Sequence, residues 1–377
     1  MRRSIPTHRH PWVRALLAAV GVALLAAVPL APAQAAPGGQ GGGDDLVVMT
    51  QNLYVGTSLD PALDATTPEQ LLQAVAQMYA TVEYTNFPAR AQAIADEIAA
   101  KDPDLIGLQE VARWTTTGVG AGPGYDFLAI LQTALEERGL DYSVAAVSDN
   151  ASIGPVPLAL PGCLSPAPPF ITCTVQLDDR DVILVNDETP GLRWDNPRSG
   201  QYVAQAELES QAGPLTFDRG WASIDGTLHK KPFRFVTTHL EIAAFPDVQE
   251  AQAAELLAGP ARGGTVIAAG DFNSAADGST TTTYAQLTAP GQLRDAWDED
   301  VLGAGFTCCQ RSNTPPLAPG ALNNPVSTLD QRIDLVLGRG AARSDGSQAE
   351  LVGDFPFQGA PPFWPSDHAG VVAEFRL

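Results

Sequence analysis

Short apolar runs that end in polar side chains recur along this chain. Such runs occupy residues 45–50, 104–108, 233–238 and 266–270, and their length and apolar character predict buried strands. The polar residues that follow them are Asn52, Glu110, His239, Asp271 and Asn273. A carboxylate or imidazole at the end of a buried strand is costly unless a cation or a hydrogen-bond partner meets it. The pattern therefore predicts a functional site where several strands end.

The run at residues 266–270 carries the densest of these motifs. Asp271 and Asn273 are two residues apart, so in extended chain both side chains point to one face, while Phe272 points the other way. A carboxylate beside a carboxamide suits a phosphoryl oxygen held next to Mg²⁺. An ordinary Asx turn at the end of a strand explains the same residues. This motif alone leaves both interpretations open.

Helical periodicity separates the strands. Apolar spacing predicts helices over residues 68–83, 89–100, 127–138 and 249–257, and Thr67 with Gln70 predicts a capping box at the start of the first. Further strands are expected at residues 181–185, 219–224, 332–337 and 370–375. Stretches rich in Gly, Pro, Thr or Ser predict loops at residues 114–124, 145–169 and 191–200. This alternation of strands and helices is compatible with an α/β fold.

The first 36 residues have the pattern of a secretory signal peptide. Arginines at positions 2, 3, 9 and 14 precede an apolar run at residues 15–31, and a small-residue cleavage site follows at residues 33–35. The apolar run is too short and too rich in alanine for a membrane span, so we expect a secreted protein without a transmembrane segment. Residues 37–43 form a Gly-rich flexible linker, and residues 44–377 are expected to form one folded domain. The paired arginines leave the export route open.

The charge balance is strongly acidic. The sequence has 22 Lys and Arg against 43 Asp and Glu, a net charge of −21, and loss of the four arginines of the signal peptide leaves −25. Such a field opposes tight non-specific binding to nucleic acid or anionic lipid. Bound divalent cations reverse the local sign, so a nuclease is not excluded.

Four cysteines occur at positions 163, 173, 308 and 309. In an exported chain disulfides are expected, and three pairings are available. A bond between Cys163 and Cys173 would close a small loop and leave Cys308 and Cys309 to bridge each other or stay reduced. The sequence leaves these arrangements and cross-pairing open. A structural zinc site is disfavoured because no Cys-x-x-Cys spacing occurs.

The ordered motifs resemble those of the endonuclease/exonuclease/phosphatase superfamily, which includes deoxyribonuclease I, abasic-site endonucleases, bacterial sphingomyelinases and inositol polyphosphate phosphatases. The resemblance spans residues 45–375. It is carried, in order, by Asn52, Gln109-Glu110, His239, Gly270-Asp271-Phe272-Asn273, Arg332-Ile333-Asp334 and Ser366-Asp367-His368. It implies an α/β fold: a four-layer α/β sandwich with two central mixed β-sheets flanked by helices. We also expect a monomer.

The resemblance also implies roles for these residues. Glu110 would bind the catalytic Mg²⁺, or Mn²⁺ or Ca²⁺ in its place, with Asn52 beside it and Asp367 as a ligand or orienting group. His368 would be the general base or a phosphate-stabilising imidazole, and Asp334 would orient it. Asp271 would position or deprotonate the attacking water, and Asn273 would hold a phosphoryl oxygen. His239 would protonate the leaving group or stabilise the transition state. Hydrolysis of a phosphodiester needs an activated nucleophile, neutralisation of charge on the phosphoryl oxygens and a proton for the leaving oxygen, and these residues with the metal could supply all three.

The expected function is therefore a secreted, Mg²⁺-dependent phosphoesterase that hydrolyses a phosphodiester, either as a nuclease or as a phospholipase of the sphingomyelinase/phospholipase C type. Its substrate partner would be a nucleic acid or a phospholipid head group. A phosphomonoesterase of the same fold and a non-catalytic secreted binding module are the alternatives. The segment at residues 178–186 lacks the Gly-rich pattern of many relatives, so the side chain that grips the phosphate is not placed by sequence.

Overall fold

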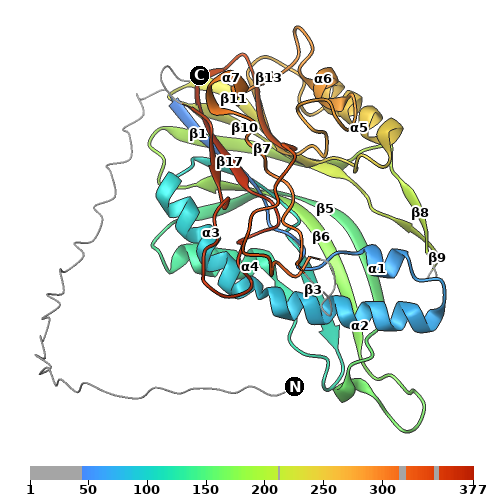
Figure 1. The fold of residues 1–377 in the computed structure, drawn as a ribbon. Coiled ribbons are helices and arrows are strands. Elements are labelled where there is room, and N and C mark those ends of the chain that lie inside the picture. Colours follow the sequence, from blue (N-terminus) through green and yellow to red (C-terminus); the bar gives the residue numbers. More distant parts are fainter. Residues whose placement is uncertain (1–44, 211–212, 314–319, 344–347) are drawn as a thin grey trace, which may run out of the picture. The chain divides into compact units, whose positions relative to one another are not determined.

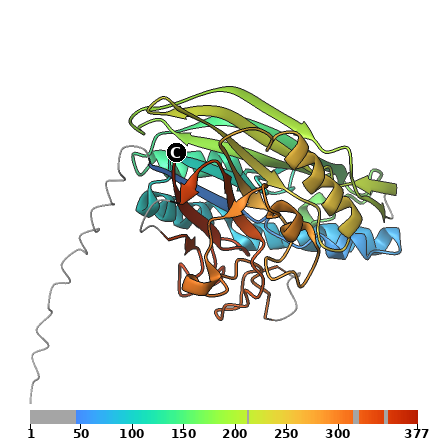
Figure 2. The same cartoon turned by 90° about the horizontal axis from the view of Figure 1, so that it is seen from above.

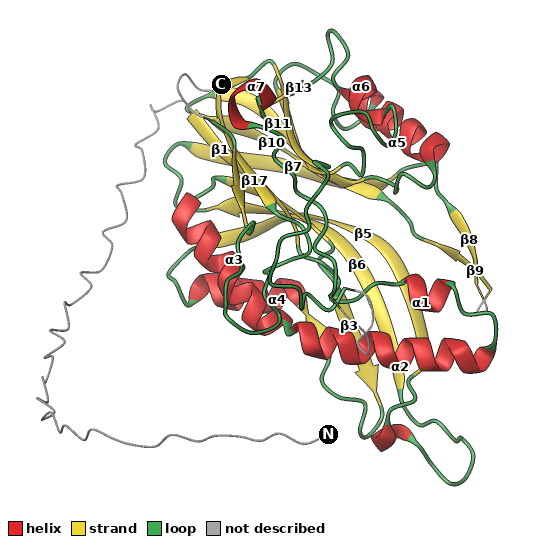
Figure 3. Cartoon of the chain, in the orientation of Figure 1, coloured by secondary structure: helices red, strands yellow, loops and turns green. Residues whose placement is uncertain are grey.

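Two mixed β-sheets pack against each other at the centre of the fold (Figures 1 and 3). The computed structural model describes residues 45–377 except 211–212, 314–319 and 344–347. The predicted signal peptide and linker lie outside the described residues. Within the part of the chain that is described, no helix has the length and apolar character needed to cross a membrane.

The larger sheet has nine strands in the order β15-β17-β1-β2-β6-β3-β4, with β16 paired to β17 and β5 paired to β6. Its members are β1 (Asp45–Asn52), β2 (Leu105–Gln109), β3 (Arg113–Thr117), β4 (Tyr125–Asp126), β5 (Tyr142–Pro157), β6 (Thr174–Asn186), β15 (Ala342–Arg343), β16 (Glu350–Val352) and β17 (Gly370–Arg376). The first strand, β1, runs parallel to β2 and antiparallel to the last strand, β17. The two ends of the described chain therefore meet in the middle of one sheet.

The smaller sheet has six strands in the order β13-β14-β12-β11-β10-β7. Its members are β7 (Leu192–Gln201), β10 (Gly220–Leu228), β11 (Lys231–His239), β12 (Val266–Asp271), β13 (Arg294–Asp295) and β14 (Asp334–Arg339). Strands β11 and β12 are parallel, so their carboxyl ends, His239 and Asp271, lie side by side in register. A separate two-stranded ribbon pairs β8 (Glu207–Ser210) with β9 (Gly213–Thr216).

Helices cover both outer faces, as Figure 1 shows. Their bounds are α1 (Asp60–Leu63), α2 (Pro68–Thr85), α3 (Phe87–Lys101), α4 (Phe127–Glu136), α5 (Pro246–Ala258), α6 (Thr283–Leu287) and α7 (Glu299–Leu302), with a short 3₁₀ helix at Pro161–Cys163. One apolar core lies between α2–α4 and the larger sheet, one between the two sheets, and one between the smaller sheet and α5–α6. This arrangement confirms the expected four-layer sandwich.

The helix starts follow their local chemistry. Thr67 Oγ1 accepts a hydrogen bond from Gln70 N at 3.2 Å, as predicted for the cap of α2. The reciprocal bond differs from the prediction, because Gln70 Oε1 accepts from Thr66 N rather than from Thr67 N. Pro68 occupies the first turn, where a missing N–H costs nothing.

Three predicted loops contain strands. Residues 114–124, 145–169 and 191–200 were expected to be irregular, but β3 covers residues 114–117, β5 covers 145–157 and β7 covers 192–200. The remainder of the first two ranges lies outside strands, as predicted. In β5 the Pro and Gly residues are accommodated by register shifts on both sides of Ile153. The polar strand β7 is at the edge of its sheet (Figure 2), where exposed side chains and a proline are tolerated. Pairing with neighbouring strands therefore overrides the local composition.

The disulfide pairing that the sequence left open is Cys163 with Cys173 and Cys308 with Cys309. The first bond ties the 3₁₀ segment to the strand that begins at residue 174. The second joins two adjacent residues in the long connection between α7 and β14.

Arg90 is fully buried on α3 and binds backbone rather than a carboxylate. Its Nη1 donates to the carbonyl oxygens of Leu53 at 2.6 Å and Pro365 at 2.8 Å, and its Nη2 donates to Tyr54 O at 3.1 Å. Its Nε donates to Thr85 O at 3.1 Å. One guanidinium thus joins the segment just after β1 to the segment just before β17.

Replacement of Arg90 by lysine should destabilise the fold strongly. An ammonium group keeps the charge but does not reach four separate carbonyls, and each buried carbonyl left without a donor costs about 1–3 kcal/mol. We expect the free energy of unfolding, measured by urea titration, to fall by about 3 kcal/mol or more. Arg113→Lys is the control, because that guanidinium pairs with Asp178 at an exposed site and such pairs contribute about 1 kcal/mol or less. Equal losses in the two variants would contradict the role of Arg90.

Candidate active site

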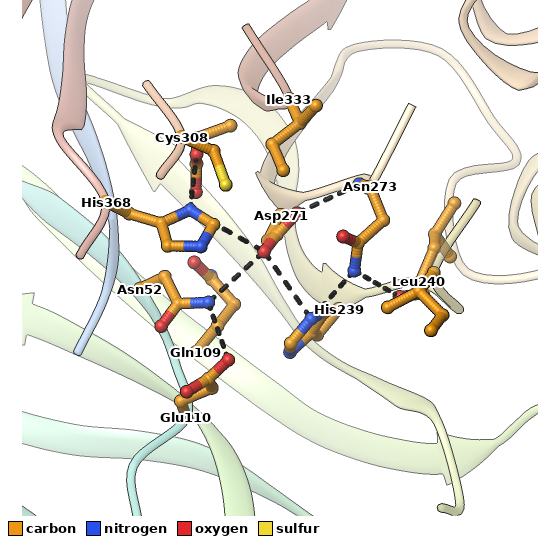
Figure 4. Close-up of polar contacts among 12 residues, drawn as sticks. Asn52, Gln109, Glu110, His239, Leu240, Asp271, Asn273, Cys308, Ile333 and His368 are labelled. Atoms are coloured by element: carbon orange, nitrogen blue, oxygen red, sulfur yellow. Dashed lines mark hydrogen bonds and ion pairs between the residues drawn. The ribbon is translucent and has the colours of Figure 1, made fainter. Parts of the chain in front are cut away.

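The ends of four strands from both sheets meet at one place (Figure 4). Asn52 and Glu110 come from the ends of β1 and β2 in the larger sheet, and His239 and Asp271 from the ends of β11 and β12 in the smaller one. The structure brings together all eight side chains that the sequence nominated: Asn52, Glu110, His239, Asp271, Asn273, Asp334, Asp367 and His368.

Asn52 connects the two sheets. Its Nδ2 donates to Glu110 Oε1 at 3.1 Å and to Asp271 Oδ2 at 3.2 Å, while its Oδ1 accepts from Tyr54 N at 2.9 Å. The second oxygen of Glu110 accepts from Val55 N at 2.7 Å. In this arrangement the nitrogen of Asn52 faces the carboxylates, so Asn52 acts as a hydrogen-bond donor between two acidic groups.

Asp271 and Asn273 both contact His239, although the extended chain from which a shared face was predicted ends at Asp271 and Asn273 has a left-handed backbone. Nε2 of His239 lies 3.5 Å from Asp271 Oδ2 and 3.0 Å from Asn273 Nδ2. Asn273 Nδ2 also donates to Leu240 O at 2.9 Å. Asn273 N donates to Asp271 Oδ1 at 2.9 Å, so the Asx turn is present as well. The Asx turn therefore does not exclude the other interpretation, in which Asp271 and Asn273 form a polar pair for a phosphoryl oxygen.

Two site residues have left-handed backbones. Glu110 has φ of 53° and Asn273 has φ of 50°. Residues other than glycine seldom adopt this conformation, and the surrounding structure must hold them there. In each case the chain turns sharply as it leaves its strand, which directs the side chain into the site.

His368 lies on the other side of Asp271 from His239. Its Nδ1 is 2.8 Å from Asp334 Oδ2 and 3.8 Å from Asp271 Oδ2. Its Nε2 has only longer neighbours, at 3.9 Å from both Asp367 Oδ1 and Cys309 Sγ. Asp334 therefore orients the ring and leaves Nε2 available to a substrate.

Burial and mutual charge shift the pKa values of these groups. Burial, and then the charge of Asp334, raise the pKa of Asp271 to about 7. Burial also raises the pKa of Asp367 to about 7, with Glu110 adding to the effect. Both shifts arise first from burial and then from neighbouring carboxylates, so ionising these two carboxyls in the metal-free protein is costly.

The two imidazoles are shifted in opposite directions. Burial alone would lower the pKa of His368, but the carboxylates of Asp334 and Asp367 outweigh it and raise that pKa well above its usual value. Burial, and then the charge of Arg219, lower the pKa of His239 well below its usual value. The site thus pairs a cationic imidazole with a neutral one at neutral pH.

The floor of the site is the closest approach of the two sheets. Gln109 accepts from Thr50 Oγ1 at 3.1 Å and donates to Thr237 Oγ1 at 2.9 Å, which links β1, β2 and β11. A Cβ added at Gly107 would lie 2.5 Å from Thr237 Oγ1. Only glycine allows the sheets to approach this closely here.

A cleft of about 770 Å³ opens above these residues. Glu110, His239 and Asp367 reach its surface, and so do Arg219 and Cys309. Arg219 Nη2 lies 3.6 Å from Glu241 Oε1, and the Nε of Arg219 is buried without a partner. The cleft therefore contains a cationic side chain beside the catalytic candidates.

Sequence reasoning did not find Arg219 or Cys309. The hairpin register offered a signal for the first: Trp221 pairs with Thr238 across the β10–β11 turn, so residue 219 lies opposite residue 240, next to His239. The position of Cys309 depends on how the connection between α7 and β14 folds back. There the backbone of Cys308 forms isolated antiparallel β-bridges with Gln331 and His368, and no local sequence pattern predicts them.

The donor set suits a hard divalent cation. Oδ1 of Asp367 and Oδ1 of Asp334 are buried without a hydrogen-bond partner. Ligand atoms of Asp271, Asp334 and His368 lie within 4.8 Å of one another. Carboxylate oxygens are the ligands that Mg²⁺ and Ca²⁺ prefer. Cys308, Cys309 and His368 also cluster, but the two cysteines are bonded to each other.

Comparisons with known proteins agree with this geometry. The sequence profile of the Endonuclease/Exonuclease/phosphatase family matches residues 49–368. Among solved structures, a family protein from Leptotrichia buccalis C-1013-b is 14% identical with a TM-score of 0.52, over 88% of this chain and 100% of that one. The protein of this class from Beutenbergia cavernae DSM 12333 is 19% identical with a TM-score of 0.51, over 89% and 72%. Likeness at these identities shows the shared fold. No curated protein matches significantly.

Asp271→Asn should stabilise the metal-free protein at alkaline pH. The folded protein keeps a proton on Asp271 up to about pH 7, whereas an unfolded aspartate loses it near pH 4. Since the folded state binds more protons in this window, the contribution of Asp271 to stability falls as pH rises through it. We expect the variant, measured with chelator, to exceed wild type by more than about 1 kcal/mol at pH 8 and the difference to vanish near pH 4.

The exposed Asp64→Asn is the control for that comparison, because Asp64 lies at the end of α1 and does not line the cleft. It should change the free energy of unfolding by less than about 0.5 kcal/mol at either pH. If Asp271→Asn showed no pH-dependent gain, the cost inferred for ionising Asp271 in the metal-free protein would be wrong.

Proposed function

Because the chain belongs to the endonuclease/exonuclease/phosphatase family, we propose that it is a metal-dependent hydrolase of phosphodiesters. Members of this family are generally metal-dependent phosphoesterases. The observation that carries the proposal is the position of Asp271 between two imidazoles, 3.5 Å from His239 Nε2 and 3.8 Å from His368 Nδ1. Of these three groups His239 lines the cleft, while Asp271 and His368 are buried beside it. Together they supply a proton acceptor and hydrogen-bond donors of the kind that water attack on phosphorus requires.

Glu110 and Asp367 would hold the divalent cation, with Mg²⁺ as the first candidate and Mn²⁺ or Ca²⁺ as alternatives. Both reach the cleft, and the charge of Glu110 adds to the effect of burial in raising the pKa of Asp367. Asn52 would keep Glu110 in place through its Nδ2. When bound, the cation would neutralise charge on the non-bridging phosphoryl oxygens.

Asp271 would accept the proton of the attacking water. Its Oδ1 is held by Asn273 N and its Oδ2 by Asn52 Nδ2, so the carboxylate has a fixed orientation. A pKa of about 7 suits a general base at neutral pH. As the water oxygen bonds to phosphorus, the bond from phosphorus to the leaving oxygen breaks, and the leaving oxygen takes its proton from solvent in the cleft.

His368 would stabilise charge on the phosphoryl group. Asp334 holds its Nδ1, and the elevated pKa of the ring favours a protonated Nε2 that donates to a phosphoryl oxygen. This favours the phosphate-stabilising alternative over the role of base.

His239, Asn273 and Arg219 would complete the polar wall. Asn273 Nδ2 is a donor, so Nε2 of His239 accepts and the proton of the neutral ring is on Nδ1. A neutral His239 whose Nε2 accepts from Asn273 fixes Asn273 and has no proton on Nε2 to give to a leaving group. Arg219 is the candidate for the phosphate-gripping side chain that the sequence did not place.

We also propose that the protein is exported. The charged, apolar and small-residue regions of residues 1–36 support this, and the buried disulfide between Cys163 and Cys173 fits an oxidising compartment.

The catalytic proposal predicts metal-dependent hydrolysis that His368→Ala abolishes. Bis-p-nitrophenyl phosphate, plasmid DNA and sphingomyelin would be assayed in parallel, with Mg²⁺ and with chelator. We expect at least one substrate to be cleaved only with Mg²⁺, and His368→Ala to lower kcat by about 10²–10⁴-fold. His229→Ala is the matched control, because this exposed histidine lies on the β10–β11 turn away from the cleft.

Other outcomes would count against the proposal in distinct ways. Equal losses in the His368 and His229 variants would remove His368 from the chemistry. If none of the diesters is cleaved while thermal unfolding still shows stabilisation by Mg²⁺ that Glu110→Gln removes, diester hydrolysis would be wrong. Phosphomonoesters and the binding-module alternative would then be tested.

Export predicts a shortened amino terminus. Expression of the full chain in a secreting host should release protein into the medium, and intact-mass measurement should show removal of about the first 36 residues. A cell-associated protein of full mass would contradict this expectation.

A further inference from the structure

An apolar hollow of about 480 Å³ adjoins the cleft. It lies between the helices α1 and α2 and the strands β3, β5 and β6, all drawn in Figure 3. One stripe of α2 lines it through Leu71, Val75 and Met78, which are spaced by four and three residues. Its volume is within the range of roughly 300–1,000 Å³ typical of small-molecule sites. We call it the apolar pocket.

The walls of the apolar pocket have no free polar side chain among the residues that line it. Ser152 and Trp114 are the lining residues with a side-chain hydrogen-bonding group. Ser152 Oγ donates to Asp178 Oδ1 at 2.7 Å, and Trp114 Nε1 donates to Val55 O at 2.8 Å. Both groups are therefore occupied within the protein. A ligand in this pocket gains contact with hydrocarbon and no charged partner.

The apolar pocket and the cleft share one wall. Four residues line both hollows: Leu59, Ile153, Leu177 and Phe217. A molecule with its phosphate near His239 and Asp367 thus has an apolar surface beside it. The register shifts of β5 on both sides of Ile153 bend the strand at this junction.

We propose that the apolar pocket receives the hydrocarbon part of an amphiphilic phosphodiester while its phosphate occupies the cleft. This inference rests on the function proposed above and specifies its substrate class. The charge of the chain supports it, because a net charge of −21 repels a polyanion far more than a diester with a single negative charge. A nucleic acid also has no long alkyl chain to fill an apolar pocket.

A chain-length series tests the proposal. Methyl, butyl and octyl p-nitrophenyl phosphates carry the same charge and leaving group, and they would be assayed with Mg²⁺ below the concentration at which micelles form. Full burial of a methylene corresponds to about a fourfold gain. We therefore expect kcat/KM to rise at least about tenfold from methyl to octyl. Equal kcat/KM values for the three substrates would overturn the proposal.

A filling variant tests the location. Ala62 on α1 lines the apolar pocket, whereas Ala76 on α2 lines neither hollow. Ala62→Trp should lower the octyl-to-methyl ratio of kcat/KM at least about fivefold, and Ala76→Trp should leave this ratio as in wild type. An unchanged ratio in Ala62→Trp would overturn the assignment to this pocket.

Binding of alkylphosphonates separates this inference from the catalytic one. Calorimetry on the wild-type protein should give octylphosphonate at least about tenfold tighter binding than methylphosphonate. If octylphosphonate binds at least about tenfold more tightly but no diester is cleaved, binding of hydrocarbon in the apolar pocket is supported and phosphodiester hydrolysis is contradicted. If diesters are cleaved but the two phosphonates bind equally, the phosphodiesterase stands and the apolar pocket is not a substrate site.

Discussion

The carboxylates of Glu110 and Asp271 come from different sheets and share the amide group of Asn52. Glu110 follows β2 of the larger sheet and Asp271 ends β12 of the smaller one, and the charge of Glu110 adds to the effect of burial and of Asp334 in raising the pKa of Asp271. The Nδ2 group donates to both, at 3.1 and 3.2 Å, and so holds them together in the absence of a cation. This arrangement stores electrostatic repulsion at the seam between the sheets. A bound divalent cation would relieve it, so the proposed active site would also be a weak point of the metal-free fold.

The seam is kept narrow by contacts that contain no catalytic group. Gly107 lets Thr237 approach from the other sheet, and Gln109 spans the gap by hydrogen bonds on both sides. Behind the site, Arg90 fixes the carbonyls on either side of it. Activity therefore depends on the packing of the sandwich as a whole, because a shift of one sheet changes every distance between the two halves of the site.

The sequence predicted the members of the site better than their arrangement. The end of a buried strand can be recognised from the sequence alone, so apolar runs that stop at His239 or Asp271 predict the site directly. The pairing of His368 with Asp334 followed only from the resemblance to a known family. Arg219 was missed because its place depends on strand register. Strands β5 and β7 were missed because pairing with neighbours outweighed their Pro, Gly and polar content. Which atom of Asn52 faces Glu110 is set by Tyr54 N–H, a contact that no sequence pattern encodes.

The pairing of β1 with β17 makes the order of synthesis matter. A ribosome synthesises Asn52 long before His368, and β1 finds its antiparallel neighbour only when β17 exists. Contacts between such distant segments form late in folding because a long loop must close first. A nascent chain thus has no complete candidate site until β17 has been synthesised. The topology alone would withhold the proposed hydrolytic chemistry from every copy in which β17 is not yet paired.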